Sequence, residues 1–257
     1  QEPLPEGGVY VLELSSYQID LCHALDCDIA VLLNITPDHL DRYDGFADYA
    51  AAKERLFTMQ HVDKVAVIAT EDDRTKMIAS RINHRLMRVS SKQVGDQSRW
   101  PSLQGPHNAQ NVAAARAVAE VLGIKASTIE EALHTYPGLP HRMERVRELG
   151  GVVYVNDSKA TNPTSTAPAL AAFPAIHWIL GGRAKTSELD GCVPYFGHVR
   201  AAYTIGESAG MFASLLKGSM PVSECGSLDI AVRAASKAAV AGETVLLSPA
   251  CASFDQF

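Results

Sequence analysis

The chain has 257 residues, 47% of them hydrophobic, and a formal net charge of -6 at pH 7. This length fits one large domain or two ordinary ones, with enough apolar residues to build their cores. The net negative charge argues against a nucleic-acid partner, which would need a basic face. No apolar run is long enough to cross a membrane.

The cysteines and the two ends of the sequence bear on where the protein works. The five cysteines are scattered and form no CxxC pair, so a disulfide framework or a structural zinc site is not expected, and a reducing cytoplasm fits. The first residues, QEPLPEGG, lack the basic start and apolar stretch of a signal peptide.

The first strand pattern begins at Val9 and the last residues, SFDQF, stop in mid-pattern. We therefore expect the sequence to be part of a longer enzyme.

Apolar runs of strand length alternate along the chain with longer amphipathic stretches. Short, β-branched and nearly continuous apolar runs are typical of strands buried on both faces of a parallel sheet, and their alternation with helices indicates α/β layers. The predicted strands cover residues 9–14, 29–35, 65–69, 152–155, 176–180, 201–205 and 244–247. The predicted helices cover residues 46–59, 108–122, 128–136, 208–216 and 228–241.

A break between two domains is predicted after the helix at 128–136. The segment YPGLPH, which ends at His141, carries two prolines and a glycine. Proline cannot continue a helix and glycine often follows its end. We therefore predict one domain over residues 1–138 and a second over residues 139–257.

Polar clusters follow the first two predicted strands, at the position where open α/β sheets bind ligands. Glu13 opens the motif ELSSYQ, and its carboxylate could bind Mg²⁺, cap a helix or pair with a buried cation. His39 lies in NITPDHLDRY between two acids, where it could be a metal ligand, a proton carrier or an ordinary surface histidine. Lys53, in the next predicted helix, is by itself an ordinary solvated lysine.

The motif GPHNAQN stands at the start of the predicted helix 108–122. It places Asn108 and Asn111 on one face of the first turn. Their amide groups could read an adenine edge, which offers both donors and acceptors. Capping of the helix is the alternative, and the local sequence by itself favours it.

Three polar loops follow predicted strands in the second half of the chain. The first, NDSKATNP, precedes a helix, and its Lys159 and Thr161 would make an anion site at the helix start, although an ordinary turn is the alternative. The second, LGGRAK, carries glycines that let a backbone approach a ligand closely. The third is SPACASFDQF. We expect these three strand ends to converge on one ligand.

Several motifs are missing from the sequence. The chain has no G-x-x-x-x-G-K-[ST] phosphate loop, so as given it cannot cradle ATP in the usual way. It also has no G-x-G-x-x-G, which argues against a nicotinamide dehydrogenase, and no G-x-S-x-G nucleophile elbow.

Taken in order, the motifs resemble those of the Mur ligases, the ATP-dependent enzymes of peptidoglycan precursor synthesis. The segments ELSSYQ, NITPDHLDRY, AAK, GPHNAQN, GLPHRME, NDSKATNP, LGGRAK and LLSPACASFDQF span nearly the whole chain. NDSKATN and SPACASFDQF are the most specific, and they look like those of the member that adds D-glutamate to UDP-N-acetylmuramoyl-L-alanine. Other Mur ligases, folylpolyglutamate synthase and a non-catalytic Rossmann-like binding module are the alternatives.

The resemblance implies a fold, a reaction and partners. It implies a central ATP-binding α/β domain over residues 1–138, without its N-terminal part and its phosphate loop, and a C-terminal Rossmann-like domain over residues 139–257 that binds the amino acid. The cofactors would be ATP and Mg²⁺, and the reaction would pass through an acyl phosphate. The partners would be the two small-molecule substrates, with no nucleic acid or membrane. We expect a cytoplasmic monomer, inactive as this fragment alone.

The resemblance also implies roles for single residues. The catalytic and metal-binding residues would be Glu13, His39 and Lys53, with Lys53 carbamylated. The contacts with ATP would come from Asn108, Asn111, Arg142 and Asp157. The residues that hold D-glutamate would be Lys159, Thr161, Lys185, Ser253 and Phe254. One departure from the family pattern is Arg183, where some relatives have an acid after the two glycines.

Overall fold

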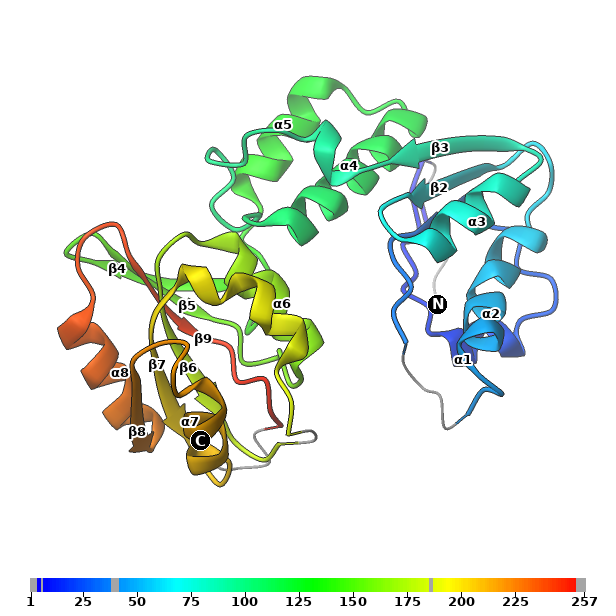
Figure 1. Cartoon of the computed structure of the whole chain (residues 1–257). Helices are drawn as coiled ribbons and strands as arrows, with labels where there is room; N and C mark the ends of the chain where they lie inside the picture. Colours follow the sequence, from blue (N-terminus) through cyan, green and yellow to red (C-terminus); the bar gives the residue numbers. More distant parts are fainter. Residues whose placement is uncertain (1–3, 6, 38–41, 185–186, 253–257) are drawn as a thin grey trace. The chain divides into compact units, whose positions relative to one another are not determined.

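The structure, a computed structural model, describes residues 4–5, 7–37, 42–184 and 187–252. The chain folds into two compact units, one made of Gln1–Gln93 with Ala113–Ile124, and one made of Val94–Val112 with Lys125–Phe257. Each unit contains a sheet whose strands are mostly parallel and alternate with helices (Figure 1). The predicted α/β class is confirmed.

Three parallel strands form the sheet of the first unit, in the order β1-β2-β3. The strands are β1 (Ile29–Leu32), β2 (Val65–Ala69) and β3 (Arg85–Val89). All five residues of β2 are buried, as expected of a strand between two parallel neighbours. Helices of this unit include α1 (Ser16–Leu21), α2 (Phe46–Thr58) and α3 (Asp73–Arg81). Residues of α2 and α3 pack with Ala66 and Ile68 of β2, so both helices cover the same face of the sheet.

The strand predicted over residues 9–14 does not form, and this prediction is wrong. The segment is irregular, and Val9, Val11 and Leu12 expose 53%, 90% and 60% of their surface. An apolar, β-branched run indicates a segment that tends to be buried, but a strand exists only where a neighbouring strand completes its hydrogen bonds. The run is left here as an exposed apolar segment.

Six strands form the sheet of the second unit, in the order β4-β5-β9-β6-β7-β8. The strands are β4 (Glu144–Leu149), β5 (Val152–Asn156), β6 (Ile176–Gly181), β7 (Val199–Ile205), β8 (Val222–Gly226) and β9 (Thr244–Leu247). All neighbours are parallel except β4 and β5, which form an antiparallel hairpin. The edge strands β4 and β8 escaped sequence prediction because most of their residues are polar or exposed, as is usual at sheet edges.

Helices cover both faces of the second sheet. They are α6 (Pro163–Ala172), the 3₁₀ helix η2 (Asp190–His198), α7 (Ala209–Leu216) and α8 (Leu228–Ala238). Trp178 and Leu180 of β6 pack in one core with residues of α6, η2 and α7. Ile179, between them in sequence, packs in a second core with Ala231 and Ala235 of α8. Successive side chains of a strand point to opposite faces, so these two cores are the two faces of one sheet.

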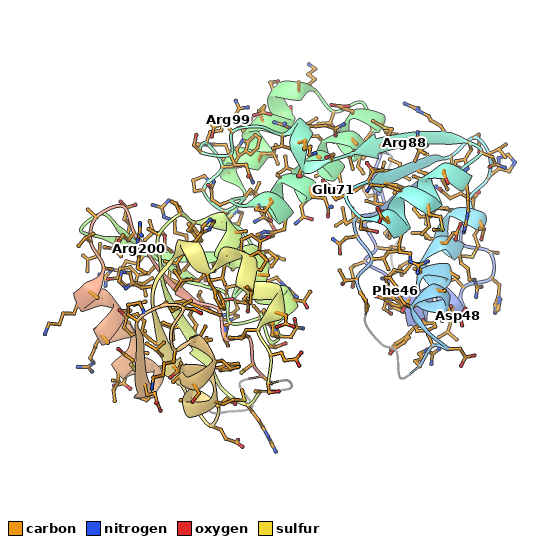
Figure 2. The ribbon with its side chains drawn as sticks, in the orientation of Figure 1. Phe46, Asp48, Glu71, Arg88, Arg99 and Arg200 are labelled. Atoms are coloured by element: carbon orange, nitrogen blue, oxygen red, sulfur yellow. The ribbon has the colours of Figure 1, made fainter. Side chains whose placement is uncertain are left out.

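Residues 94–105, together with α4 (Pro106–Val121) and α5 (Ala126–Thr135), connect the two sheets along the chain. In this segment Trp100 is fully buried. The guanidinium of Arg99, a residue labelled in Figure 2, lies 5.0 Å from the Trp100 ring centroid. Arg99 also pairs with Glu130 of α5 at 3.5 Å. Residues 94–105 and α5 thus pack together within the second unit, whereas residues 113–124, which include the end of α4, belong to the first unit. Among the residues that the structure describes, no helix is both long and apolar enough for a membrane span.

Candidate functional site

The three polar loops of the second half lie side by side at the carboxyl edge of its sheet. They follow β5, β9 and β6, which are adjacent and parallel. The Ala250 amide donates to the Ala160 carbonyl at 3.0 Å, which joins the loops after β9 and β5. The Arg183 amide donates to the Ala252 carbonyl at 2.8 Å, which joins the loops after β6 and β9. These backbone bonds give the edge a single connected surface.

Asp157, the first residue after β5, is buried beneath this surface. It is 6% exposed, and one of its carboxylate oxygens accepts the Met143 amide at 3.1 Å. The other accepts the Ser248 hydroxyl at 2.8 Å, and that hydroxyl lies 3.1 Å from Thr166 Oγ1. Burial raises the pKa of Asp157 to about 6, although the bonds from Ser248 and Met143 and the charge of Arg142 act against the shift. Asp157 is therefore an anchor that ties β5, β9 and the turn before β4 together.

Ser248 and Thr166 were not among the predicted site residues. Both side chains are fully buried, and the Ser248 carbonyl also accepts the Trp178 indole N–H at 2.8 Å. The sequence holds a weak hint, because Ser248 is a polar residue directly after a buried strand. Ser248 is 91 positions from Asp157 and 82 positions from Thr166, so sequence spacing does not reveal these buried contacts.

Three residues other than glycine adopt positive φ angles around Asp157. They are His141 (φ 63), Met143 (φ 50) and Ala250 (φ 56). The His141 carbonyl accepts the Lys159 amide at 3.1 Å, so each of the three is bonded to the loop that follows β5. Such conformations are uncommon for residues with a Cβ, and strained backbone of this kind tends to cluster at functional sites. Arg142, between two of them, is exposed.

The loop after β5 leads directly into α6. Lys159 is exposed and Thr161 is partly buried. Asn162 caps α6 by accepting the Ser165 amide at 2.8 Å, so the end of this motif has an ordinary capping role. Lys159 and Thr161 are thus held just before the positive end of a helix dipole, as the anion-site prediction requires. Lys185, Ser253 and Phe254 lie outside the described residues.

The glycine of the loop after β6 has a structural reason that the sequence did not show. Gly181 has φ 129, and a Cβ there would lie 2.0 Å from the Ile205 carbonyl oxygen of β7. Packing against β7 therefore requires glycine at this position. That the glycines of this loop let its backbone approach a ligand stays a prediction.

The predicted metal residues of the first unit are only partly described. Glu13 is exposed and precedes α1, whose N-cap is Ser15, so the alternative that Glu13 caps a helix is wrong. The Lys53 ammonium lies 5.1 Å from the ring centroid of Tyr49, one turn earlier on α2. His39 lies outside the described residues. Within the described ranges, no group of three or more His, Cys, Asp or Glu side chains is arranged to hold a metal ion.

Asn108 and Asn111 lie together on the first turns of α4, as their spacing predicted. The Asn111 amide donates to Asn108 Oδ1 at 3.3 Å, and the Asn108 amide donates to the Gln104 carbonyl at 3.0 Å. Asn108 is half-buried and Asn111 is exposed. In the first turn of α4, burial lowers the pKa of His107 to about 4, so this histidine is neutral at physiological pH.

Two family models match separate parts of the chain. The Mur ligase middle domain matches residues 4–101, and the Mur ligase glutamate ligase domain matches residues 141–251. The chain belongs to the Mur ligases. The predicted division after residue 138 falls in the interval between the two matches.

Curated Mur ligases are similar to this chain over its whole length. The UDP-N-acetylmuramoylalanine--D-glutamate ligase of Sphingopyxis alaskensis is 59% identical over 264 residues, which cover 100% of this chain and 61% of that protein. The enzyme of the same name from Zymomonas mobilis subsp. mobilis is 57% identical over 259 residues, which cover 100% of this chain and 59% of that protein. The chain thus spans about three fifths of the length of these relatives.

Solved Mur ligase structures share the fold at low identity. The MurF ligase of Thermotoga maritima in complex with ADP has a TM-score of 0.70 and 16% identity, and the match covers 91% of this chain and 61% of that one. The UDP-N-acetylmuramate-alanine ligase MurC of the same organism has a TM-score of 0.62 and 14% identity, and the match covers 92% of this chain and 58% of that one.

Proposed function

We propose that this chain is part of an ATP-dependent ligase that joins D-glutamate to UDP-N-acetylmuramoyl-L-alanine. The observation that carries the proposal is the 57–59% identity, over the whole chain, to relatives named UDP-N-acetylmuramoylalanine--D-glutamate ligase. Another Mur ligase or folylpolyglutamate synthase is the alternative within the fold, and solved structures with those names are 14–21% identical to this chain.

In this reaction the substrate carboxylate takes the γ-phosphoryl group of ATP, and the resulting acyl phosphate is attacked by the amine of D-glutamate with loss of phosphate. The amino acid brings two carboxylates, which need fixed cations and hydroxyls. Lys159 and Thr161 supply one of each at the start of α6. We assign Lys185, Ser253 and Phe254, from the two adjoining loops, to the same amino-acid site.

ATP would be bound by two groups of residues. Asn108 and Asn111 offer amide donors and acceptors that suit an adenine edge. Arg142 is an exposed cation suited to phosphate. Asp157 would act on the nucleotide through the turn that it anchors, because both oxygens of its buried carboxylate accept hydrogen bonds within the protein. The ADP in the Thermotoga maritima MurF ligase structure supports nucleotide binding by this fold.

Mg²⁺ would be held by Glu13, His39 and Lys53. The exposed Glu13 carboxylate offers the oxygen ligand that Mg²⁺ prefers. An unmodified lysine ammonium cannot ligate a cation, so Lys53 fits this role only as a carbamate. A bound Mg²⁺ would offset the repulsion between the substrate carboxylate and the phosphates.

ADP formation by the natural full-length protein tests the proposal. We expect ADP only when UDP-N-acetylmuramoyl-L-alanine and D-glutamate are both present. L-lysine and meso-diaminopimelate serve as rival amino acids in parallel reactions. Turnover with either of these and none with D-glutamate would overturn the assignment.

We propose further that the protein is a cytoplasmic monomer whose partners are its small-molecule substrates. The scattered free cysteines suit a reducing compartment. Sedimentation velocity of the full-length protein tests the monomer, and a sedimentation coefficient that rises with protein concentration would count against it.

A further inference from the structure

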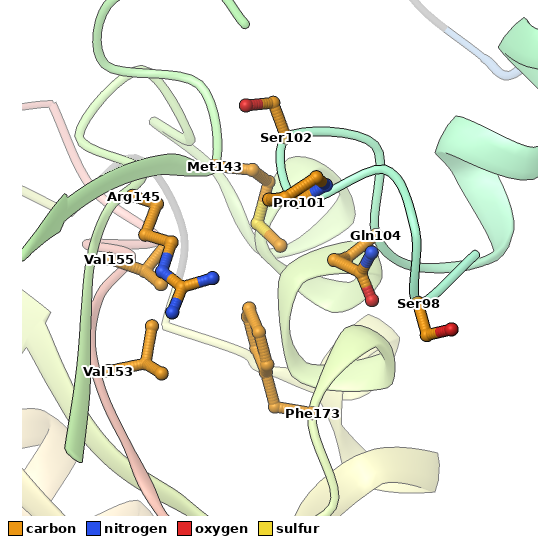
Figure 3. Close-up of a pocket in the computed structure, with 9 residues that line it drawn as sticks. All are labelled: Ser98, Pro101, Ser102, Gln104, Met143, Arg145, Val153, Val155 and Phe173. Carbon is orange, nitrogen blue, oxygen red and sulfur yellow. The ribbon is translucent and has the colours of Figure 1, made fainter. Parts of the chain in front are cut away.

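A pocket of about 260 Å³ lies within the second unit, between residues 98–104 and the hairpin of β4 and β5 (Figure 3). Its lining residues come from three parts of the chain, namely the segment before α4, the hairpin with the residue before β4, and the residue that follows α6. They are Ser98, Pro101, Ser102, Gln104, Met143, Arg145, Val153, Val155 and Phe173. None of these residues belongs to the proposed metal, nucleotide or D-glutamate sites.

One side of the pocket is apolar. Val153 and Val155 alternate along β5, so both side chains point to the same face of the sheet, the face covered by α6. Met143 and Phe173 pack against the same core. Figure 3 shows the Phe173 ring standing beside the two valines. This wall favours a ligand with an aromatic or branched apolar body, because it offers no hydrogen bonds from side chains.

The cation of the pocket is Arg145, whose guanidinium extends over the apolar wall in Figure 3. It pairs with Glu148 on the same strand, and the two side chains are 40% and 51% exposed. An ion pair this exposed contributes little to stability. Arg145 can therefore exchange Glu148 for a carboxylate in the pocket, which its planar fork binds in bidentate fashion.

Gln104 lines the wall that comes from the segment before α4. Its Nε2 donates to the Gln97 carbonyl at 2.7 Å and to the Trp100 carbonyl at 2.8 Å. Both amide hydrogens are used within the protein, so Gln104 presents its Oε1 as an acceptor. The lining residues of this wall carry no positive charge. A ligand with one carboxylate on Arg145 and a second carboxylate on this wall would leave the second one without a cation.

We propose that this pocket binds a small monocarboxylic acid with a single ring or a branched alkyl body. The carboxylate would lie on Arg145, and the body would lie on Val153, Val155 and Phe173. The volume is slightly below the range of about 300–1,000 Å³ that is typical of drug-sized ligands, so it suits a ligand of one ring. D-glutamate fits poorly, because it is hydrophilic and carries a second carboxylate.

Such a ligand would couple two parts of the chain. Ser98 and Pro101 fall in the part matched by the middle domain, and Val153 and Val155 fall in the part matched by the glutamate ligase domain. A molecule that contacts both sides stabilises the state in which residues 98–104 lie against the hairpin. Bound ligand should therefore slow hydrogen exchange of residues 98–104.

The test is a titration of the natural full-length protein with 3-phenylpropionate, followed by NMR of the labelled Met143 methyl group. We expect saturable binding with a dissociation constant of about 1 mM or tighter, as is usual for a ligand of about ten heavy atoms. The neutral alcohol 3-phenylpropanol has the same body without the charge. It should bind at least about tenfold more weakly, since a charge-assisted bidentate pair is lost.

Two variants locate the site. Arg145→Gln should weaken 3-phenylpropionate binding at least about tenfold, whereas Arg147→Gln, on the same strand but outside the pocket lining, should leave it unchanged. Lack of saturable binding, equal affinity for acid and alcohol, or equal loss in both variants would each overturn the proposal. The comparison of acid and alcohol uses the unchanged chain, so it holds even if a variant folds poorly. No measurement depends on ligase activity, so failure here is distinct from failure of the proposed function.

Discussion

Replacing Asp157 by asparagine should change how the stability of the second unit depends on pH. Burial raises the pKa of Asp157 from 3.8 to about 6. Between pH 3.8 and about pH 6, the Asp157 carboxyl therefore keeps its proton in the folded state but has lost it in the unfolded chain. Stability is lost as pH rises through that window, and the full loss is roughly 3 kcal/mol, because one pKa unit corresponds to about 1.4 kcal/mol.

The asparagine side chain of the variant would keep the shape of the aspartate and cannot ionise. Its oxygen can accept the Met143 amide, and its nitrogen can donate to the Ser248 hydroxyl, which then donates to Thr166. Asp157→Asn should therefore gain about 1.4 kcal/mol of stability relative to the unchanged chain between pH 5 and pH 8. Any difference that does not depend on pH cancels in this comparison.

Urea unfolding followed by tryptophan fluorescence measures this effect. Trp100 and Trp178, the two tryptophans of the chain, are both fully buried in the second unit, so the signal reports on the unit that contains Asp157. Asp229→Asn is the control. The pKa of this exposed carboxyl is lowered by its bond with Ser227, so it is ionised in both states across this range and its effect should not vary with pH. A pH-independent stability difference for Asp157→Asn would refute the reasoning.

Three further predictions concern backbone packing and the proposed sites. Gly181→Ala should destabilise the second unit by about 3 kcal/mol or more, because the added Cβ would meet the Ile205 carbonyl. Gly197→Ala is the control and should be nearly neutral, because nothing lies within 4 Å of a Cβ at that position. Similar urea midpoints for the two variants would contradict this prediction. Lys159→Ala in the full-length protein should raise the KM for D-glutamate about ten- to a hundredfold and that for ATP far less, and an unchanged D-glutamate KM would leave Lys159 a structural role. Lys53→Ala should abolish most activity, and short-chain carboxylic acids, but not a neutral amide of the same size, should restore part of it. Full activity of Lys53→Ala without additives would exclude the carbamate.

The sequence by itself was sufficient for the features that depend on local patterns. The strands β2, β5, β6 and β9 are nearly continuous apolar runs, and such runs are typical of strands inside a parallel sheet. Motif spacing also placed Asn108 beside Asn111, because a helical repeat of 3.6 residues is a local property. The family resemblance rests on motifs of the same local kind.

Edge strands and partner-dependent segments could not be predicted in this way. The β4 strand is mostly exposed, so its residues carry no apolar pattern that marks a strand. Residues 9–14 carry the pattern without forming the strand, because a strand requires a neighbour to bond with. In both cases the outcome depends on which other segment lies alongside.

The environment of Asp157 was decided by the tertiary structure alone. The sequence predicted a binding role for the NDSKATN loop, but nothing in it relates Asp157 to Ser248, which is 91 positions away. The order β5-β9-β6 brings those two residues together, and burial then raises the Asp157 pKa. Likewise, the steric need for glycine at position 181 comes from β7, which lies beside it only in the folded sheet. The sequence determines residue types and their local spacing. Burial, the charge state of Asp157 and the steric requirement for glycine at position 181 arise only when distant segments pack against one another.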